Sequence, residues 1–227
     1  MLVGTYCYLP EAMPSPVGHA LAGLAVGLVA TGRPGPDGPT VARLEARGAL
    51  DRLARDPMRR RAAAFAMLGA LPDVDLIVDM HSTYTHSIGA VAIVLAASWL
   101  ILQPRRAGSS TPIRRPGNLR VVRRPRRLAC AAALAYASHI LLDWLGHDPT
   151  LPIGVTALWP FSTAYYDSGL HLFMPISRRY WLDTFWSHNL VAVARELLLL
   201  VPCAVLAWWW ATRRDEVSGA RGQEGSG

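Results

Sequence analysis

The sequence is poor in several features that would point to other classes of protein. Its three cysteines, Cys7, Cys130 and Cys203, form no CxxC pair, which argues against a disulfide framework or a thiolate metal site. No basic residue precedes the first apolar segment, so we expect no secretory signal peptide. None of the 23 basic residues is lysine, which we ascribe to nucleotide composition rather than function. Charged residues make up only 17% of the chain and largely avoid its apolar runs.

Those apolar runs dominate the chain, which is 52% hydrophobic. Residues 190–210 are long enough to span a bilayer, and residues 88–102 and 128–142 approach that length with their flanks. Three tryptophans at residues 208–210, beside Arg213 and Arg214, resemble an aromatic belt at a membrane interface. The alternative is a soluble all-helical protein with buried helices. We predict an all-α polytopic membrane protein with about five membrane-embedded helices, at residues 16–31, 62–72, 84–102, 128–145 and 190–211.

We expect these helices to form one membrane domain, residues 13–211. Residues 1–12 carry no periodic pattern and precede a proline-then-helix opening, so we predict a non-native or disordered extension, with Met13 as the natural start. Residues 212–227 are predicted to be a disordered tail.

The arginines predict an orientation in the membrane. Residues 32–61 hold eight, residues 103–127 hold nine, and three follow Trp210. The positive-inside rule places these segments in the cytoplasm of a multipass cell-membrane protein. Residues 62–72 are too short to span alone and could be re-entrant, which leaves the number of crossings open. With this orientation, most of the histidines and aspartates of the apolar part gather at the extracytoplasmic face.

Two acid-containing motifs predict a metal site there. His139 and Asp143 are four residues apart on one helical face, a good bidentate arrangement for a divalent cation. In LPDVDL, residues 71–76, Pro72 favours an extended or turned chain in which Asp73 and Asp75 share a face. The alternatives are a hydrogen-bonded core histidine at residue 139 and a helix-capping role for either aspartate.

Further histidines join this set. His81 and His86 are five residues apart, so one must lie in the turn before a helix, with Ser82, Thr83 or Thr85 available as the cap. His19 lies at the outer end of the first helix. These side chains suffice for two divalent ions, zinc first and manganese second, and the predicted ligands are His19, Asp73, Asp75, His81, His86, His139 and Asp143.

The motifs also carry a family resemblance, from Met13 to Glu196. The order PSPVGHALAG, LGALPDVDLI, HSTYTHSIGA, SHILLDWLG, LWPFS resembles the YdjM-like family of membrane-bound metal-dependent hydrolases. The resemblance implies that the predicted ligands correspond to the family's characteristic polar positions. Where members usually show HRxxTHS, this chain has Ser82 in place of the arginine, which leaves the charge preference for substrate open. The HxxxD element is also similar to part of the zinc-dependent phospholipase C pattern, which suggests phosphoester cleavage.

Residues 146–188 combine histidines and acids with many aromatic side chains and are expected on the same outer face, as a lid or interfacial platform. His147 follows the fourth helix and is the next acid–base candidate. The predicted catalytic residues are Asp75, His86 and His147. Arg195 and Glu196, inside the last helix, should face the bundle, with Arg195 available to pair with an acid of the site.

The sequence therefore predicts a metal-dependent hydrolase in which activated water attacks an ester at the extracytoplasmic face. Its partners would be membrane lipids and an amphiphilic or lipid-linked substrate, with a phosphoester favoured over an acyl ester. The alternatives are a transporter with an intramembrane ion path and a scaffold clamped by metal. Nucleic-acid binding is not expected, because no interleaved aromatics or recognition motif accompany the arginines.

Overall fold

The structure, a computed structural model, describes residues 14–31, 57–78, 82–103, 119–149 and 151–223. Within these ranges it is helical, without β-strands, and two isolated bridges join Gly146 to Phe173 and Val155 to Tyr166. The elements are α1 (Pro16–Thr31), α3 (Pro57–Ala70), the 3₁₀ helices η2 (Leu71–Val78) and η3 (Tyr84–His86), α4 (Ile88–Leu102), α5 (Leu119–Leu145) and α6 (Phe185–Gln223). The all-helical prediction is confirmed for the described residues.

The predicted helices are all present, but several ends were misplaced. The first helix has the predicted bounds, whereas α3 begins at Pro57 and α5 at Leu119, each within an arginine-rich segment. The predicted ends followed the apolar runs, but arginine is a good helix former and continues a helix into polar sequence. For the same reason α6 extends to Gln223, through most of the tail predicted to be disordered.

Of the two predicted forms of LPDVDL, the extended one was wrong, and the chain adopts the turned one. Residues Leu71–Val78 form a 3₁₀ helix, with Pro72 at its second position. Proline is tolerated in a first helical turn, because the N–H that it lacks would have no partner there. The predicted cap was also wrong, since α4 begins at Ile88 and Ser87 is the residue whose side chain accepts a hydrogen bond from the Ala90 N–H.

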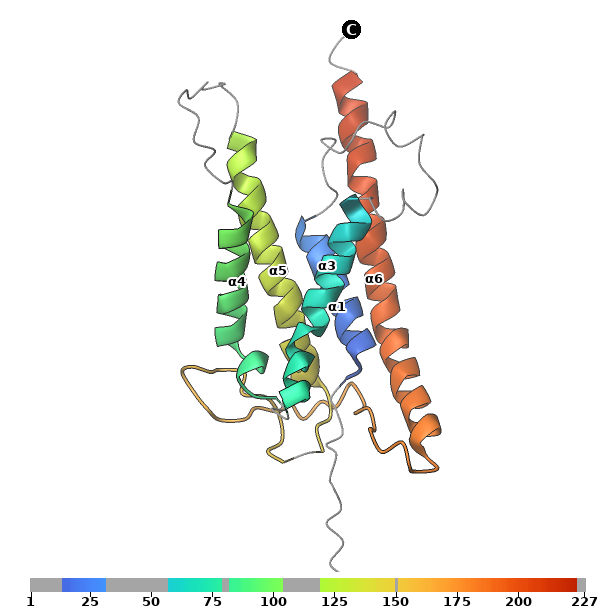
Figure 1. The fold of residues 1–227 in the computed structure, drawn as a ribbon. Helices are drawn as coiled ribbons and strands as arrows, with labels where there is room; N and C mark the ends of the chain where they lie inside the picture. The colour runs from blue at the N-terminus through green and yellow to red at the C-terminus, as the bar shows by residue number, and fades with distance from the viewer. Residues whose placement is uncertain (1–13, 32–56, 79–81, 104–118, 150, 224–227) are drawn as a thin grey trace, which may run out of the picture.

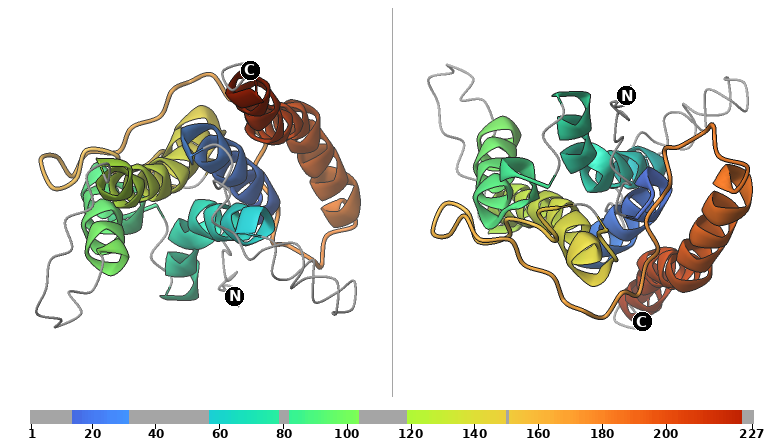
Figure 2. Two further views of the ribbon diagram at one scale, coloured as in Figure 1. Left: turned by 90° about the horizontal axis from the view of Figure 1, so that it is seen from above. Right: turned by 90° about the horizontal axis from the view of Figure 1, so that it is seen from below.

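The helices form a bundle around α1. This helix contacts α3, α5 and α6, while α4 packs against α5 on the far side of the bundle (Figures 1 and 2). The helix ends that flank residues 32–56 and 104–118 lie at one end of the bundle, and the segment after α5 runs across the other end (Figure 1). Both arginine-rich segments therefore connect to the same end, opposite residues 151–184.

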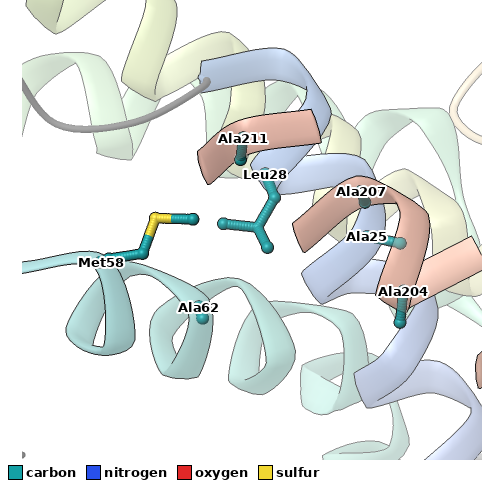
Figure 3. Close-up of a cluster of buried hydrophobic side chains, with 7 residues drawn as sticks. All are labelled: Ala25, Leu28, Met58, Ala62, Ala204, Ala207 and Ala211. Carbon is teal, nitrogen blue, oxygen red and sulfur yellow. The ribbon is translucent and has the colours of Figure 1, made fainter. Parts of the chain in front are cut away.

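Small side chains let α1, α3 and α6 approach closely. Their apolar cluster, shown in Figure 3, consists of Ala25, Leu28, Met58, Ala62, Ala204, Ala207 and Ala211. At the α1–α3 crossing two glycines leave no room for a side chain, because a Cβ on Gly23 would lie 2.5 Å from the Phe65 carbonyl oxygen and one on Gly69 would lie 2.4 Å from that of His19. Small residues of this kind are typical of helix contacts in membranes.

The outward faces are apolar. α4 has no buried residue, and its Ile93, Leu100 and Ile101 are 63%, 71% and 81% exposed. Two helical segments, Pro125–Leu145 and Phe185–Thr212, are long and apolar enough to cross a membrane, whereas α1 and α4 are apolar but shorter. Apolar surface on this scale suits a lipid environment better than water.

Candidate metal centre

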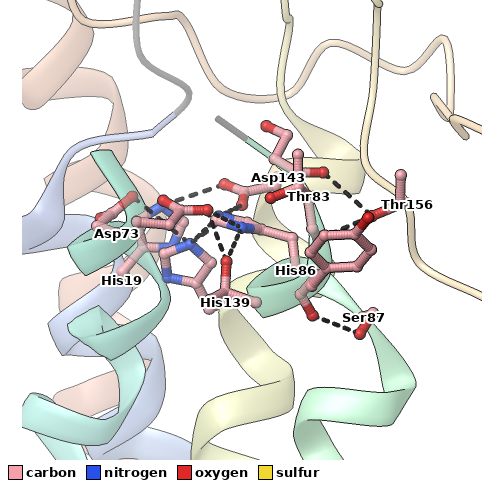
Figure 4. Close-up of polar contacts among 12 residues, drawn as sticks. His19, Asp73, Thr83, His86, Ser87, His139, Asp143 and Thr156 are labelled. Atoms are coloured by element: carbon pink, nitrogen blue, oxygen red, sulfur yellow. Dashed lines mark hydrogen bonds and ion pairs between the residues drawn. The ribbon is translucent and has the colours of Figure 1, made fainter. Parts of the chain in front are cut away.

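Six of the predicted site residues meet at one end of the bundle, where α1, η2, η3 and α5 converge. Figure 4 shows five of these side chains pointing toward one another from different elements. Four of the six are at most 2% exposed, although all are polar. The residues are His19 on α1, Asp73 and Asp75 on η2, His86 on η3, and His139 and Asp143 on α5.

The centre of the cluster is a triangle of ligand-type atoms. His139 Nε2 lies 3.0 Å from His86 Nε2, and Asp143 Oδ2 lies 3.1 Å from His139 Nε2 and 3.2 Å from His86 Nε2. Metal–ligand bonds of about 2.0–2.2 Å place neighbouring ligand atoms about 3.0–3.5 Å apart in tetrahedral or octahedral geometry. The triangle therefore has the dimensions of three ligands on a single divalent ion.

The outer nitrogens of the two imidazoles have partners that fix their tautomers. His139 Nδ1 lies 2.7 Å from the Gly69 carbonyl oxygen, which can only accept, so this nitrogen carries the hydrogen. His86 Nδ1 lies 3.2 Å from Asp75 Oδ2, which also accepts the Thr85 hydroxyl at 2.6 Å. Both Nε2 atoms then present lone pairs to the centre. Metal-ligating histidines are commonly oriented by a carbonyl or carboxylate on the other nitrogen.

The triangle is thus composed of acceptors that need a cation between them. Among the described residues, no hydrogen bond reaches either carboxylate oxygen of Asp143, Oδ2 of Asp73 or the ring nitrogens of His19. Leaving such buried groups unpartnered costs free energy. A divalent cation at the centre would satisfy these acceptors.

Asp73 and His19 complete the cluster on either side of the triangle. Asp73 Oδ1 lies 3.7 Å from His139 Nε2, and its side chain is the most exposed of the six at 19%. Burial is the main reason that its pKa is raised to about 6. His19 stacks on His139 with ring centroids 3.6 Å apart, and its Nε2 lies 3.2 Å from Asp143 Oδ1. Asp143 therefore presents one oxygen to His19 and the other to the triangle.

Comparison with known proteins identifies the family. A family model described as YdjM inner membrane protein matches residues 13–215. The chain belongs to this family. The searches of curated proteins and of solved structures returned no match.

Family membership confirms part of the sequence prediction. The YdjM description as an inner membrane protein makes the chain a membrane protein, in agreement with the exposed apolar faces of α4 and α6. The residues that line the cluster all lie within the matched region. The hydrolase activity and the metal stay predictions that the family description does not address.

The remaining predicted residues of this YdjM-family chain lie elsewhere. His81 is outside the described residues. His147 lines a neighbouring cavity instead of the cluster. Arg195 donates to the His171 carbonyl oxygen at 3.3 Å, and no ion pair joins it to a described acid of the site. Glu196 is buried, as predicted, and accepts hydrogen bonds from the backbone N–H and the hydroxyl of Ser15, just before α1.

Sequence reasoning missed the residues that hold the turn between η2 and α4. The Tyr136 hydroxyl donates to the Thr85 carbonyl oxygen at 2.7 Å, and the Thr156 hydroxyl donates to that of Thr83 at 2.7 Å. The N–H groups of Ile88 and Gly89, which the first turn of α4 leaves without helical partners, donate to the carbonyl oxygens of Ala157 and Trp159. The segment after α5 thus fixes the position of His86, a role that no motif in that segment indicates.

Proposed function

We propose that this protein is a membrane-bound metal-dependent hydrolase, with its metal in the cluster of His86, His139 and Asp143. The observation that carries the proposal is the arrangement of two imidazole nitrogens and one carboxylate oxygen, 3.0–3.2 Å apart. A two-histidine, one-carboxylate set leaves coordination positions free, as in catalytic rather than structural sites.

The residues fit a divalent ion, zinc first and manganese second. Imidazole and carboxylate are the ligands that these metals share, and the buried oxygens of Asp143 lack any hydrogen bond from the described residues. When bound, the ion would supply Lewis acidity, which acidifies water and stabilises negative charge on an ester oxygen.

The side chains around the triangle have distinct proposed roles. Asp75 orients His86 from behind, through Nδ1, so it acts as a positioning residue rather than as a ligand or base. Asp73 is the partly exposed carboxylate beside His139 and is placed to accept the proton of an attacking water. His19 contacts the second oxygen of Asp143, where it holds the carboxylate or joins a second ion.

The surroundings support a lipid-linked phosphoester as substrate. The helices that carry the cluster belong to a bundle whose outer face is apolar, for example at Leu198, which is 76% exposed. We propose that the five helices are membrane-embedded, with the cluster at the extracytoplasmic end and the arginine-rich segments in the cytoplasm. An amphiphilic substrate would reach a site at that depth from the bilayer.

The transporter alternative needs a polar path through the bundle. Among the described residues, the part of α1, α3 and α6 that lies beyond the cluster is closed by the apolar contacts of Leu28, Met58 and Ala207. A proton or ion path would need ionisable groups there. The hydrolase proposal requires none.

Activity measurements test the proposal. The purified protein in dodecyl maltoside, with zinc or manganese, would be assayed on bis-p-nitrophenyl phosphate and on phosphatidylglycerol in mixed micelles. We expect hydrolysis that a chelator abolishes and that Asp143→Asn lowers by about 100-fold or more, because a metal ligand is lost. Asp183→Asn makes the same chemical change at an exposed position outside the cluster and should have no effect. Equal activity in the two variants, or activity that survives chelation, would contradict the proposal.

A further inference from the structure

A cavity lies beside the metal cluster, at the same end of the bundle. Its volume is about 370 Å³, and its polar lining consists of His147, His171, His188 and Arg195, with Phe173 and Met174 among its apolar walls. Four side chains that carry or can carry positive charge line it, and no acid does. Asp167 pairs with this lining, with its Oδ2 3.5 Å from His171 Nε2.

Arg195 has donors to spare for a ligand. Its single hydrogen bond within the described residues runs from Nη2 to the His171 carbonyl oxygen. A guanidinium has five N–H donors, so four are left for other acceptors. An arginine with free donors in a cavity is well suited to a phosphate group, which it can bind through two parallel hydrogen bonds.

Two histidines add further recognition groups. His188 Nε2 lies 2.8 Å from the Pro175 carbonyl oxygen, so this nitrogen carries the hydrogen and the ring is held in place. His147 Nδ1 is buried and has no hydrogen-bond partner among the described residues. The rings of His147 and His171 lie 4.4 Å apart at an angle of 57°, so they form one wall of the cavity.

The backbone ties this cavity to the metal cluster. His147 lies four residues beyond Asp143, just after the end of α5, and its N–H donates to the Phe173 carbonyl oxygen at 3.0 Å. The α6 wall carries Arg195 beside Glu196, which binds Ser15 four residues before His19. Between His188 and Arg195, the two polar residues that α6 contributes to the cavity, the helix is apolar and exposed. Leu190 is 72% exposed and Val191 is 56% exposed. A ligand in the cavity would therefore lie between the cluster and a lipid-facing helix.

We propose that this cavity binds a phosphate group of the substrate, with Arg195 as the principal contact and with His147 and the protonated form of His188 as supporting contacts. This inference rests on the proposed function and deepens it, since it assigns a phosphate-bearing amphiphile as the substrate class. The phosphate could belong to a lipid headgroup or to a water-soluble ester, and the recognition chemistry is the same for both.

Binding of phospholipids to the full-length protein tests the inference. Native mass spectrometry in dodecyl maltoside would compare dioleoyl phosphatidic acid with dioleoyl phosphatidylcholine, in competition with inorganic phosphate or glycerol 3-phosphate. We expect wild type to prefer phosphatidic acid and Arg195→Gln to lower that affinity by about 10-fold or more, because charged hydrogen bonds are lost. Arg195→Lys should retain part of the binding, and Arg178→Gln, which removes one arginine outside the cavity lining, should retain all of it.

The outcomes separate this inference from the proposed function. Displacement of phosphatidic acid by millimolar inorganic phosphate would assign a water-soluble phosphate source, and binding of phosphatidic acid alone would assign a lipid; both support the site if they need Arg195. No preference in wild type, or equal losses in Arg195→Gln and Arg178→Gln, would overturn it. Metal content is measured on the same samples and should be unchanged in Arg195→Gln. A metal-free wild type that still binds phosphate through Arg195 would refute the hydrolase and leave the cavity assignment standing.

Discussion

His86 has the most constrained surroundings of any residue in the cluster. Its Nδ1 contacts both Asp75 and Thr85, while its Nε2 faces His139 and Asp143. The ring therefore has an acceptor behind it and a ligand position in front of it. An imidazole held in this way is a stronger ligand, because the carboxylate stabilises the positive charge that develops on the ring.

The carboxylate of Asp75 should strengthen metal binding by His86. Asp75→Asn keeps the size of the side chain but removes the charge behind His86, so metal affinity should fall roughly 10–100-fold. Isothermal titration with zinc in detergent, with Asp183→Asn as control, measures this change. Unchanged affinity in Asp75→Asn would show that Asp75 does not act through His86.

Metal binding should also depend on pH. Burial raises the pKa of Asp73 to about 6, so this carboxyl group takes up a proton as the pH falls below that value. Metal must then displace this proton from the cluster. Metal affinity should therefore rise with pH from 5 to about 7 and level off above that.

Calorimetry checks this prediction. Titrations at one pH in buffers of different ionisation enthalpy give the number of protons released, expected to be about one at pH 5 and close to none at pH 7.5. Zero protons released at pH 5, with affinity independent of pH, would mean that Asp73 holds no proton in the metal-free state.

At this scale the sequence predicts which residues gather but not how they pair. The spacing of His139 and Asp143 on a helix correctly predicted that they share a face. The Gly69 carbonyl, Thr85 and Tyr136 could not be predicted, because their contacts depend on how α3, η3 and α5 pack. Every residue has a backbone carbonyl, so the sequence does not show which one accepts a hydrogen bond from an imidazole.

At the scale of elements, the crossing of α1 and α3 sets the position of two parts of the site. Gly69 sits against the His19 carbonyl oxygen, and its own carbonyl oxygen holds His139. The crossing thus links packing directly to the orientation of a ligand.

Gly69→Ala should damage both stability and metal binding. A Cβ 2.4 Å from the His19 carbonyl oxygen must push the helices apart, at a cost of about 1–3 kcal/mol in the free energy of unfolding. Thermal unfolding in detergent and zinc titration measure the two effects. Ala64→Val, which adds bulk on the exposed face of α3, is the control. A stable Gly69→Ala protein with normal zinc affinity would contradict this view of the crossing.

Helix positions could be predicted from the sequence, but helix ends could not. The apolar runs located α1, α4, α5 and α6, because burial and lipid exposure both select apolar residues there. The ends depend on arginines that continue α5 and α6 and on Pro72, which lies in the first turn of η2. The hydropathy of the sequence does not predict these helix ends.

At the scale of the whole molecule, the bundle has two different ends. One end carries the cluster and the cavity lined by His147 and Arg195. The helix ends that flank the arginine-rich segments lie at the other end (Figure 1). The positive-inside rule then predicts that the cluster faces the extracytoplasmic side.

Cysteine labelling tests this orientation. In a chain with Cys7, Cys130 and Cys203 replaced by serine, Thr163→Cys and Gln103→Cys place exposed thiols at opposite ends of the bundle. A membrane-impermeant maleimide should label Thr163→Cys in intact spheroplasts and Gln103→Cys only after lysis. The reverse pattern would place the cluster in the cytoplasm.

Metal content tests the central claim most directly. The wild-type protein and the double variant His139→Ala/Asp143→Ala would be purified in mild detergent and compared by elemental analysis, with Asp183→Asn as the control. The account predicts one or two equivalents of zinc or manganese in wild type and in the control, and none in the double variant. A wild-type protein that holds no metal, and takes up none when zinc or manganese is supplied, would contradict it.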